Sequence, residues 1–242
     1  MEFSYRDIDE EGSEILDVIS SANKFNSWMY KTISPFCSGN ILEIGCGLGN
    51  ISQYFIQDNR SIFLSDIRPN YLDFCKKTFH LEDAKLLNID IADANFNEKY
   101  SRLFNTFDSI FCLNVLEHIQ DDRVAVKNMT NLLSDHGRLT VLVPAYPFLY
   151  NGIDKALQHY QRYNKKTFKE LLSELGNATH LFYFNAMGIP AWFLGGKLFK
   201  KNTIPRSKMN WYDFFVPLWK LIDRITFSKM GLSLVCVIHK TA

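Results

Sequence analysis

The sequence predicts a doubly wound α/β fold, in which parallel strands alternate with helices along the chain. Short apolar segments are separated by segments with helical periodicity over most of the chain. The first apolar segment, 41–44, leads into the turn 45–49, which has glycine at every second position. The next apolar segment, 62–65, ends in the carboxylate of Asp66. A glycine-rich turn after one strand, beside an acid at the end of the next, is typical of a nucleotide-binding sheet.

Each expected helix has a local signal at one of its ends. Pro69 is suited to the first turn of a helix over 69–79, because proline has its φ preset and lacks an N–H that would have no partner there. Asp121 and Asp122 favour the start of a helix over 121–133, and Gly137 is a candidate for its C-terminal cap. Two further helices are expected near 50–57 and 166–175. Strands are expected over 40–46, 61–66, 84–89, 107–113, 137–143, 179–185 and 232–239.

The rest of the chain is expected to cover this sheet within one domain, 1–242. Residues 1–37 are expected to be helical and to precede a ligand-binding core at 38–145. The segment 146–165 reads as a polar and aromatic loop. Residues 188–230 read as a mostly helical insertion, in which Pro217 should kink or restart a helix. Such a long connection is typical of segments that serve a ligand.

Charge and cysteine content exclude several classes of protein. A net charge of +1 excludes a generally basic nucleic-acid binder, although residues 1–17 are acidic and residues 188–230 are basic. The five cysteines are odd in number, include no C-x-x-C pair and predict free thiols in a reducing compartment. No cluster of Cys or His has metal-ligand spacing, so no metal is expected. The lack of a signal peptide and of a long apolar segment predicts a cytoplasmic protein.

The glycine spacing indicates which class of nucleotide-like ligand the turn could bind. Gly45, Gly47 and Gly49 form G-x-G-x-G, which is neither the G-x-G-x-x-G of pyrophosphate binding nor a triphosphate loop. The ligand is therefore expected to resemble a nucleoside without a phosphate bridge. Asp66 could accept hydrogen bonds from both ribose hydroxyls.

These motifs, in this order, resemble the class I S-adenosylmethionine (SAM) methyltransferases. The resemblance rests on 43–49, Asp66, Asp90, Phe107-Asp108 and the run 114–118, Asn-Val-Leu-Glu-His. It implies a Rossmann-like, seven-stranded, mostly parallel sheet with an antiparallel last strand and a helical cap. It also implies SAM as the cofactor.

The resemblance assigns roles to residues along the glycine turn and the strand ends. Gly45, Gly47 and Gly49 would let the backbone pass under the methionine and ribose of SAM. Glu43 would orient that turn or accept from the amino group of the ligand. Asp66 would hold the ribose hydroxyls, Asp90 (with Asp93 as a competitor) would accept from the adenine amine, and Asn114 would face the methionine part.

Two groups are candidates for the chemistry at the transferred methyl. Glu117 and His118 are either a wall of the cofactor site, or a base near the transferred methyl, or simply a helix-turn acid with a solvated histidine. In the loop 146–165, His159 is the candidate base, because a neutral imidazole can take a proton from a hydroxyl near pH 7. Its neighbours Asp154, Arg162 and Tyr163 are candidate substrate residues.

A narrower resemblance extends over nearly the whole chain. Trp28, the loop 154–163 and the segments 189–192 and 231–234 are similar to a type 11/12-like bacterial subgroup. Members of that subgroup are often associated with glycosyltransferases that act on lipid phosphates in cell-surface glycan pathways. Gln158 stands where the subgroup has glycine before His159-Tyr160, so a side chain at this position is expected to affect the turn of the loop.

The insertion 188–230 combines aromatic residues with net positive charge. Its aromatic and aliphatic residues recur at helical spacing. The segment is therefore either a peripheral contact with an anionic membrane or a lipid phosphate, or an ordinary cap that packs over the sheet and forms the acceptor site.

The function expected is SAM-dependent methyl transfer, most readily to oxygen, on a small or lipid-linked acceptor such as a glycan precursor. The protein is expected in the cytoplasm, at most peripheral to the inner face of the membrane, with no nucleic-acid partner. The alternatives are N- or C-methylation of a soluble or quinone-type acceptor, a non-catalytic SAM-binding partner of a membrane glycosyltransferase, and a nucleotide-binding oxidoreductase. The last needs a pyrophosphate loop that the glycine spacing does not supply.

Overall fold

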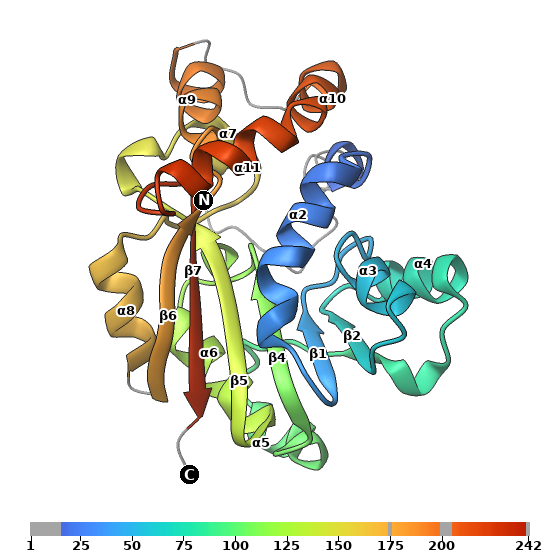
Figure 1. Ribbon diagram of the computed structural model, residues 1–242. Coiled ribbons are helices and arrows are strands. Elements are labelled where there is room, and N and C mark those ends of the chain that lie inside the picture. Colours follow the sequence, from blue (N-terminus) through green and yellow to red (C-terminus); the bar gives the residue numbers. More distant parts are fainter. Residues whose placement is uncertain (1–15, 174–175, 199–204, 241–242) are drawn as a thin grey trace.

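The computed structural model of the protein describes residues 16–173, 176–198 and 205–240, which form a seven-stranded sheet with helices on both faces (Figure 1). The strand order is β3-β2-β1-β4-β5-β7-β6. The α/β fold class is therefore confirmed. The strands are β1 Ile41–Ile44, β2 Ile62–Asp66, β3 Leu86–Asn88, β4 Phe107–Leu113, β5 Leu133–Pro144, β6 Gly176–Phe184 and β7 Ser233–Lys240.

The sheet is parallel except at β7. Strand β1 pairs in parallel with β2 (Ile41 opposite Ile62) and with β4 (Ile41 opposite Ser109). Strand β7 is antiparallel to both β5 and β6. The four residues of β1 are all buried, because helices cover both faces of a parallel sheet.

The helices follow the expected pattern, with one correction. Pro69 lies in the first turn of α4, and the Asp121 carboxylate accepts a hydrogen bond from the Val124 amide (3.3 Å) at the start of α6. The expectation that Gly137 caps α6 is wrong, because α6 ends at Leu132 and β5 begins at the next residue. The helices are α2 Asn23–Ile33, α3 Ser52–Gln57, α4 Pro69–Phe79, α5 Phe96–Tyr100, α6 Asp122–Leu132, α7 Gly152–Ala156, α8 Lys165–Ser173, α9 Gly188–Trp192, α10 Arg206–Phe214 and α11 Val216–Ile225.

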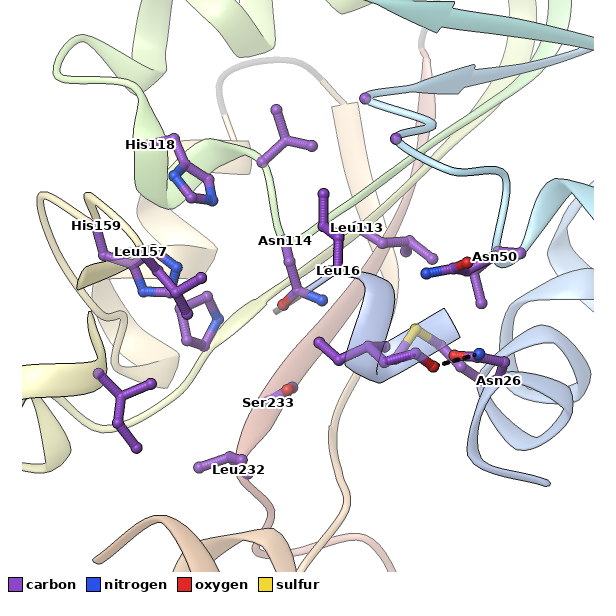
Figure 2. A pocket seen from close by; sticks show the side chains of 18 of the residues that line it. Leu16, Asn26, Asn50, Leu113, Asn114, His118, Leu157, His159, Leu232 and Ser233 are labelled. Atoms are coloured by element: carbon purple, nitrogen blue, oxygen red, sulfur yellow. Dashed lines mark hydrogen bonds between the residues drawn. The ribbon is translucent and has the colours of Figure 1, made fainter. Parts of the chain in front are cut away.

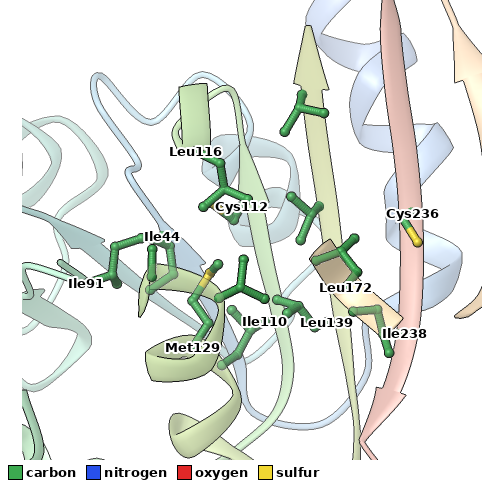
Figure 3. Close-up of a cluster of buried hydrophobic side chains, with 14 of the residues drawn as sticks. Ile44, Ile91, Ile110, Cys112, Leu116, Met129, Leu139, Leu172, Cys236 and Ile238 are labelled. Carbon is green, nitrogen blue, oxygen red and sulfur yellow. The ribbon is translucent and has the colours of Figure 1, made fainter. Parts of the chain in front are cut away.

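Two apolar clusters, one on each face, hold the helices on the sheet. On one face, Met129 of α6 and Leu172 of α8 pack against side chains of β4, β5 and β7 (Figure 3). On the other face, Phe55 of α3 stacks on Phe111 of β4 with ring centroids 5.0 Å apart, and α2 covers the same cluster through Ile33. Both clusters contain fully buried large side chains, whose truncation costs about 3–5 kcal/mol each.

Helices of the loop 146–165 and of the insertion 188–230 lie beyond the carboxyl ends of the parallel strands. Figure 1 shows α7, α9, α10 and α11 together at that end of the sheet. Pro217 lies in the first turn of α11, so the helix restarts there as expected. Residues 1–15 of the expected N-terminal cap, and Lys200 and Lys201 of the basic insertion, lie outside the described residues. Within the described ranges, no helix is both long and apolar enough to span a bilayer.

Candidate active site

A cavity of about 650 Å³ opens at the carboxyl ends of β1, β2 and β4, between the sheet and the helices of the cap, and Figure 2 shows residues that line it. This is the edge at which open α/β sheets bind ligands, and its volume is typical of a small-molecule site. One wall consists of the glycine turn and the ends of β1, β2 and β4, and the opposite wall consists of residues from 115–119, α7 and the insertion. The two walls therefore bring the two groups of predicted residues to one cavity.

The glycine turn closes the cavity at the end of β1. Gly45 has φ +74°, and a Cβ there would lie 2.4 Å from Cγ2 of Val115, so only glycine fits. The Gly47 amide donates a hydrogen bond to Oδ2 of Asp66 (2.9 Å), which ties the turn to β2. Both glycines line the cavity.

Gly49 has a different place from the one expected. It is not among the residues that line the cavity, and a Cβ on it would lie 2.4 Å from Cε2 of Phe79. Its expected contact with the ligand is corrected to a packing role, in which the turn lies close against α4.

The carboxylate of Asp66 lies at the end of β2, buried and facing the cavity. Its oxygens accept from the amides of Gly47 and Arg68, each at 2.9 Å. Burial raises its pKa above the ordinary value, and these two backbone donors act in the opposite direction. Each oxygen keeps a further lone pair for a ligand hydroxyl.

The structure distinguishes between the two acids after β3. Asp90 lines the cavity, and its Oδ1 accepts from the Ala92 amide at 2.9 Å. Asp93 instead forms a salt bridge with Lys99 (3.1 Å) and is not among the lining residues. Asp90 is thus the acid placed to meet a ligand base.

Glu43 and Asn114 complete this wall. Glu43 is buried, accepts a hydrogen bond from the Ser52 hydroxyl, and has a pKa raised well above its ordinary value by burial. Asn114 has φ +54° at the end of β4, and its amide side chain lies in the middle of the cavity (Figure 2). Asparagine tolerates this backbone conformation better than most residues.

A buried carboxylate in α7 organises the opposite wall. Asp154 is fully buried and accepts from Nδ1 of His159 (3.0 Å), Nε of Arg162 (2.7 Å) and Nε1 of Trp192 (3.3 Å). Burial raises its pKa, but the hydrogen bond from His159 and the charge of Arg162 outweigh that effect, so its pKa lies below the ordinary value. Asp154 is not itself a lining residue. It positions three residues that are, His159, Arg162 and Trp192.

His159 is held with one nitrogen toward Asp154 and the other toward the cavity. Because Asp154 is ionised and can only accept, Nδ1 donates to it, and Nε2 is the ring nitrogen that remains for another partner. The Tyr150 hydroxyl donates to the His159 carbonyl (2.6 Å) and fixes the backbone. The ring centroids of His159 and His118 lie 4.7 Å apart.

The structure bears on the alternatives for Glu117 and His118. Glu117 is 0% exposed, and among the described residues neither of its carboxylate oxygens has a hydrogen-bond partner. Burial raises its pKa to about 7, against the effect of nearby His159. His118 lines the cavity, and burial lowers its pKa to about 3. Glu117 thus lies in the turn of a short helix as expected, but it is buried there, and His118 belongs to the cavity wall rather than to the outer solvated surface.

The structure brings together a cluster of potential metal ligands that no spacing pattern in the sequence indicates. One ligand atom from each of Glu117, His118 and His159 lies within 4.8 Å of the other two. The cluster combines the segment 116–118 with a loop far along the chain, so no local spacing pattern could indicate it.

Two further residues differ from expectation. Tyr163 does not line the cavity, since it is buried and its hydroxyl donates to Oδ2 of Asp122 (2.9 Å), so its expected substrate role is corrected to a structural one. Gln158 lines the cavity with φ +58°, the region that favours glycine. Glycine, the residue expected at this position, adopts this backbone conformation without strain, whereas the backbone of Gln158 is strained. Trp192, one of the aromatic residues of the insertion that could form the acceptor site, lines the cavity and stacks on the Arg162 guanidinium at 4.6 Å.

Comparison with known proteins agrees with this arrangement. Residues 42–139 match a family model described as a methyltransferase domain. The mitochondrial ubiquinone biosynthesis O-methyltransferase of Schizosaccharomyces pombe is 28% identical over 131 residues, covering 54% of this chain and 47% of that protein. The (S)-coclaurine N-methyltransferase of Papaver somniferum is 24% identical over 173 residues, covering 67% and 46%. The chain spans about half the length of these curated relatives.

Solved structures share the fold. A SAM-dependent methyltransferase from Archaeoglobus fulgidus matches with a TM-score of 0.57 at 14% identity, covering 89% of this chain and 94% of that chain. Phosphoethanolamine N-methyltransferase 2 of Haemonchus contortus in complex with SAM also matches with a TM-score of 0.57, at 16% identity, covering 90% and 52%.

Proposed function

We propose that the protein, whose residues 42–139 match a methyltransferase domain, transfers the methyl group of SAM to an oxygen atom of an acceptor bound in this cavity. The observation that carries the proposal is the Asp154–His159 pair, which presents a proton-accepting nitrogen to the cavity from the wall opposite the glycine turn. The methyl group is supplied by the sulfonium of SAM, and the protein contributes position and a proton acceptor.

The residues of the first wall fit the cofactor. Gly45 and Gly47 would bring the backbone close to it, Asp66 would accept from the ribose hydroxyls, and Asp90 would accept from the adenine amine. Glu43 would support the turn beneath the ligand through its bond to Ser52. Asn114 would mark the methionine end, which lies toward His118 and His159 (Figure 2).

In this proposal His159 is the general base. Nε2 takes the proton of the acceptor hydroxyl as the acceptor oxygen bonds to the methyl carbon, and Asp154 stabilises the imidazolium that forms. His159→Ala should keep SAM binding within about twofold and slow turnover by about 10²-fold or more. His180→Ala, an exposed histidine on β6, is the matched control. Turnover of His159→Ala near that of His180→Ala would contradict the base assignment.

The outer surface of α10 and α11 supports a lipid-linked acceptor. Leu218, Leu221 and Ile225 are exposed at spacings of three and four on α11, and Trp211 and Phe214 continue the spacing on α10, where they are 71% and 66% exposed. We call these five residues the apolar patch. The same α10 contributes Met209 and Tyr212 to the cavity lining, so this helix carries both cavity-lining residues and part of the exposed apolar patch.

Charges around the apolar patch favour an anionic membrane as its partner. Arg224 and Lys229 are exposed, and Nζ of Lys24 lies 5.1 Å from the centre of the Phe214 ring. The two acids of this segment are engaged inward instead. Asp213 accepts from the Phe25 amide (2.7 Å), and Asp223 accepts from the amides of Asn185 and Ala186 (2.7 Å each). An apolar face with basic neighbours is the pattern of interfacial helices.

Vesicle binding tests the membrane part of the proposal. The triple variant Leu218→Ser/Leu221→Ser/Ile225→Ser should partition at least about tenfold less onto vesicles containing phosphatidylglycerol. The control Phe74→Ser/Val124→Ser removes exposed apolar side chains elsewhere and should partition like the wild type. Equal partition of all three proteins would show that the apolar patch is not a membrane surface.

Methyl transfer from isotope-labelled SAM into a total cell extract tests the acceptor, with Asp66→Ala as the blank. Label in the organic phase would support a lipid-linked acceptor, such as a glycan precursor. Label in the aqueous phase would favour N-, C- or O-methylation of a soluble molecule, and the relatives of this chain include both O- and N-methyltransferases. No label above the blank, with SAM still bound, would favour a non-catalytic SAM-binding partner.

A further inference from the structure

We propose that Glu117, His118 and His159 bind a divalent cation at the wall of the cavity, and that this cation holds the acceptor oxygen for methyl transfer. The role of this cation rests on the proposed function, whereas the cation site rests only on the residues of this chain.

The three side chains are arranged as ligands of one ion. Nε2 of His159 and Oε1 of Glu117 are 4.0 Å apart, and the three ligand atoms lie within 4.8 Å of one another. Ions of the zinc type bind nitrogen and oxygen at about 2.0–2.2 Å, which places neighbouring ligands about 3–4 Å apart. A contraction of roughly 1–2 Å at the widest separation would close the site. Figure 2 shows His118 and His159 on the same side of the cavity.

Both histidines are oriented as metal ligands are. A ligating histidine usually donates its second ring N–H to a carboxylate or a backbone carbonyl, which leaves the other nitrogen for the metal. His159 meets this requirement through Asp154 (3.0 Å), and the ring of His118 is hydrogen-bonded to the backbone of Leu157.

Glu117 is the observation that points most directly to a cation. Its carboxylate is fully buried beside the cavity, and neither oxygen has a hydrogen-bond partner among the described residues. The nearby guanidinium of Arg162 is already bound to Asp154 and to the Ala145 carbonyl (3.0 Å) and stacks on Trp192. A buried carboxylate without a partner is costly, and a bound cation would supply one.

Two imidazoles and one carboxylate suit Zn²⁺, Mn²⁺ or Co²⁺, and three protein ligands leave a position open for a further ligand. The acceptor hydroxyl would take that position, since His118 and His159 line the cavity. The hydroxyl loses its proton to solvent, the oxygen forms a bond to the methyl carbon, and the carbon–sulfur bond breaks. In this arrangement His159 is a ligand rather than a base.

Metal titration tests the site without reference to activity. Protein stripped by a chelator is titrated with Co²⁺ by calorimetry and visible absorption, with Zn²⁺ in competition. We expect one ion per wild-type chain, an increased Tm, and an affinity at least about 100-fold lower in Glu117→Gln and in His118→Gln. Asp93→Asn, a carboxylate outside the cavity, should bind like the wild type. Stoichiometric binding unaffected by Glu117→Gln and His118→Gln, or no binding, would overturn the proposal.

Methyl transfer by the stripped enzyme then separates this proposal from the previous one. Loss of transfer on chelation and recovery with Zn²⁺, Mn²⁺ or Co²⁺, with SAM affinity unchanged, would support the metal site. Full transfer by the stripped enzyme would overturn it and leave His159 as the base. If neither form transfers methyl to any extract, the proposed function fails, while the Co²⁺ titration still decides whether the site exists.

Discussion

The buried pair of Asp154 and Arg162 gives a sharp prediction for both stability and catalysis. Nε of Arg162 lies 2.7 Å from Oδ1 of Asp154, and both side chains are at most 1% exposed. Asp154→Asn keeps the shape of the side chain but removes its charge. The guanidinium then stays buried without the carboxylate that is hydrogen-bonded to it.

The size of the effect follows from that unpaired charge. Removing one partner of a buried ion pair costs about 3–5 kcal/mol of unfolding free energy, because the other charge stays desolvated. For a chain of this length the loss corresponds to a decrease in Tm of about 10 °C. Arg162→Met in the same chain removes the stranded charge. The double variant should therefore be more stable than the sum of the two single losses predicts, by about 2–3 kcal/mol.

Thermal unfolding of the four proteins measures this coupling, and SAM titration gives an independent readout. Because Asp154 does not line the cavity, SAM affinity should stay within about twofold in Asp154→Asn, while methyl transfer falls because His159 loses its orientation. Strictly additive losses of stability, or a Tm within 2 °C of the wild type (on the order of 1 kcal/mol or less), would refute the reasoning.

Three further predictions concern the first wall and the loop. Asp66→Ala should weaken SAM binding at least about tenfold, because two ribose hydroxyls lose an acceptor at about 1–3 kcal/mol, and an unchanged Kd would refute the ribose assignment. Gln158→Gly should raise Tm by about 1–4 °C, because relief of the strain at φ +58° exceeds the added entropy of the unfolded chain, and a lower Tm would contradict this. Gly45→Ala should destabilise the protein by about 2–4 kcal/mol, and adding Val115→Ala should restore part of that loss in denaturant unfolding; no restoration would show that the contact with Val115 is not the cause.

Local patterns in the sequence were sufficient for most of the fold. The period of the apolar residues and the positions of Pro69 and Asp121 follow from short-range rules, and the structure has α4 over the expected residues and Asp121 at the start of α6. Gly137 shows where such rules fail. Pairing with β4 extends β5 back to Leu133, so the expected cap lies inside a strand.

The sequence by itself determined the first wall of the cavity. The residues of that wall lie at the ends of successive strands, and short-range patterns in the sequence are enough to locate those ends. Glu43, Gly45, Gly47, Asp66, Asp90 and Asn114 all reach the cavity at the edge of the sheet where the strand pattern places them. The tertiary structure alone decided the opposite wall. Whether Glu117 is solvated or buried, whether Tyr163 faces the cavity or Asp122, and which side chains share Asp154 all depend on how α7 and the insertion pack over 113–119. The physical reason is that burial and pairing of charges are long-range properties, set by residues far apart in the chain.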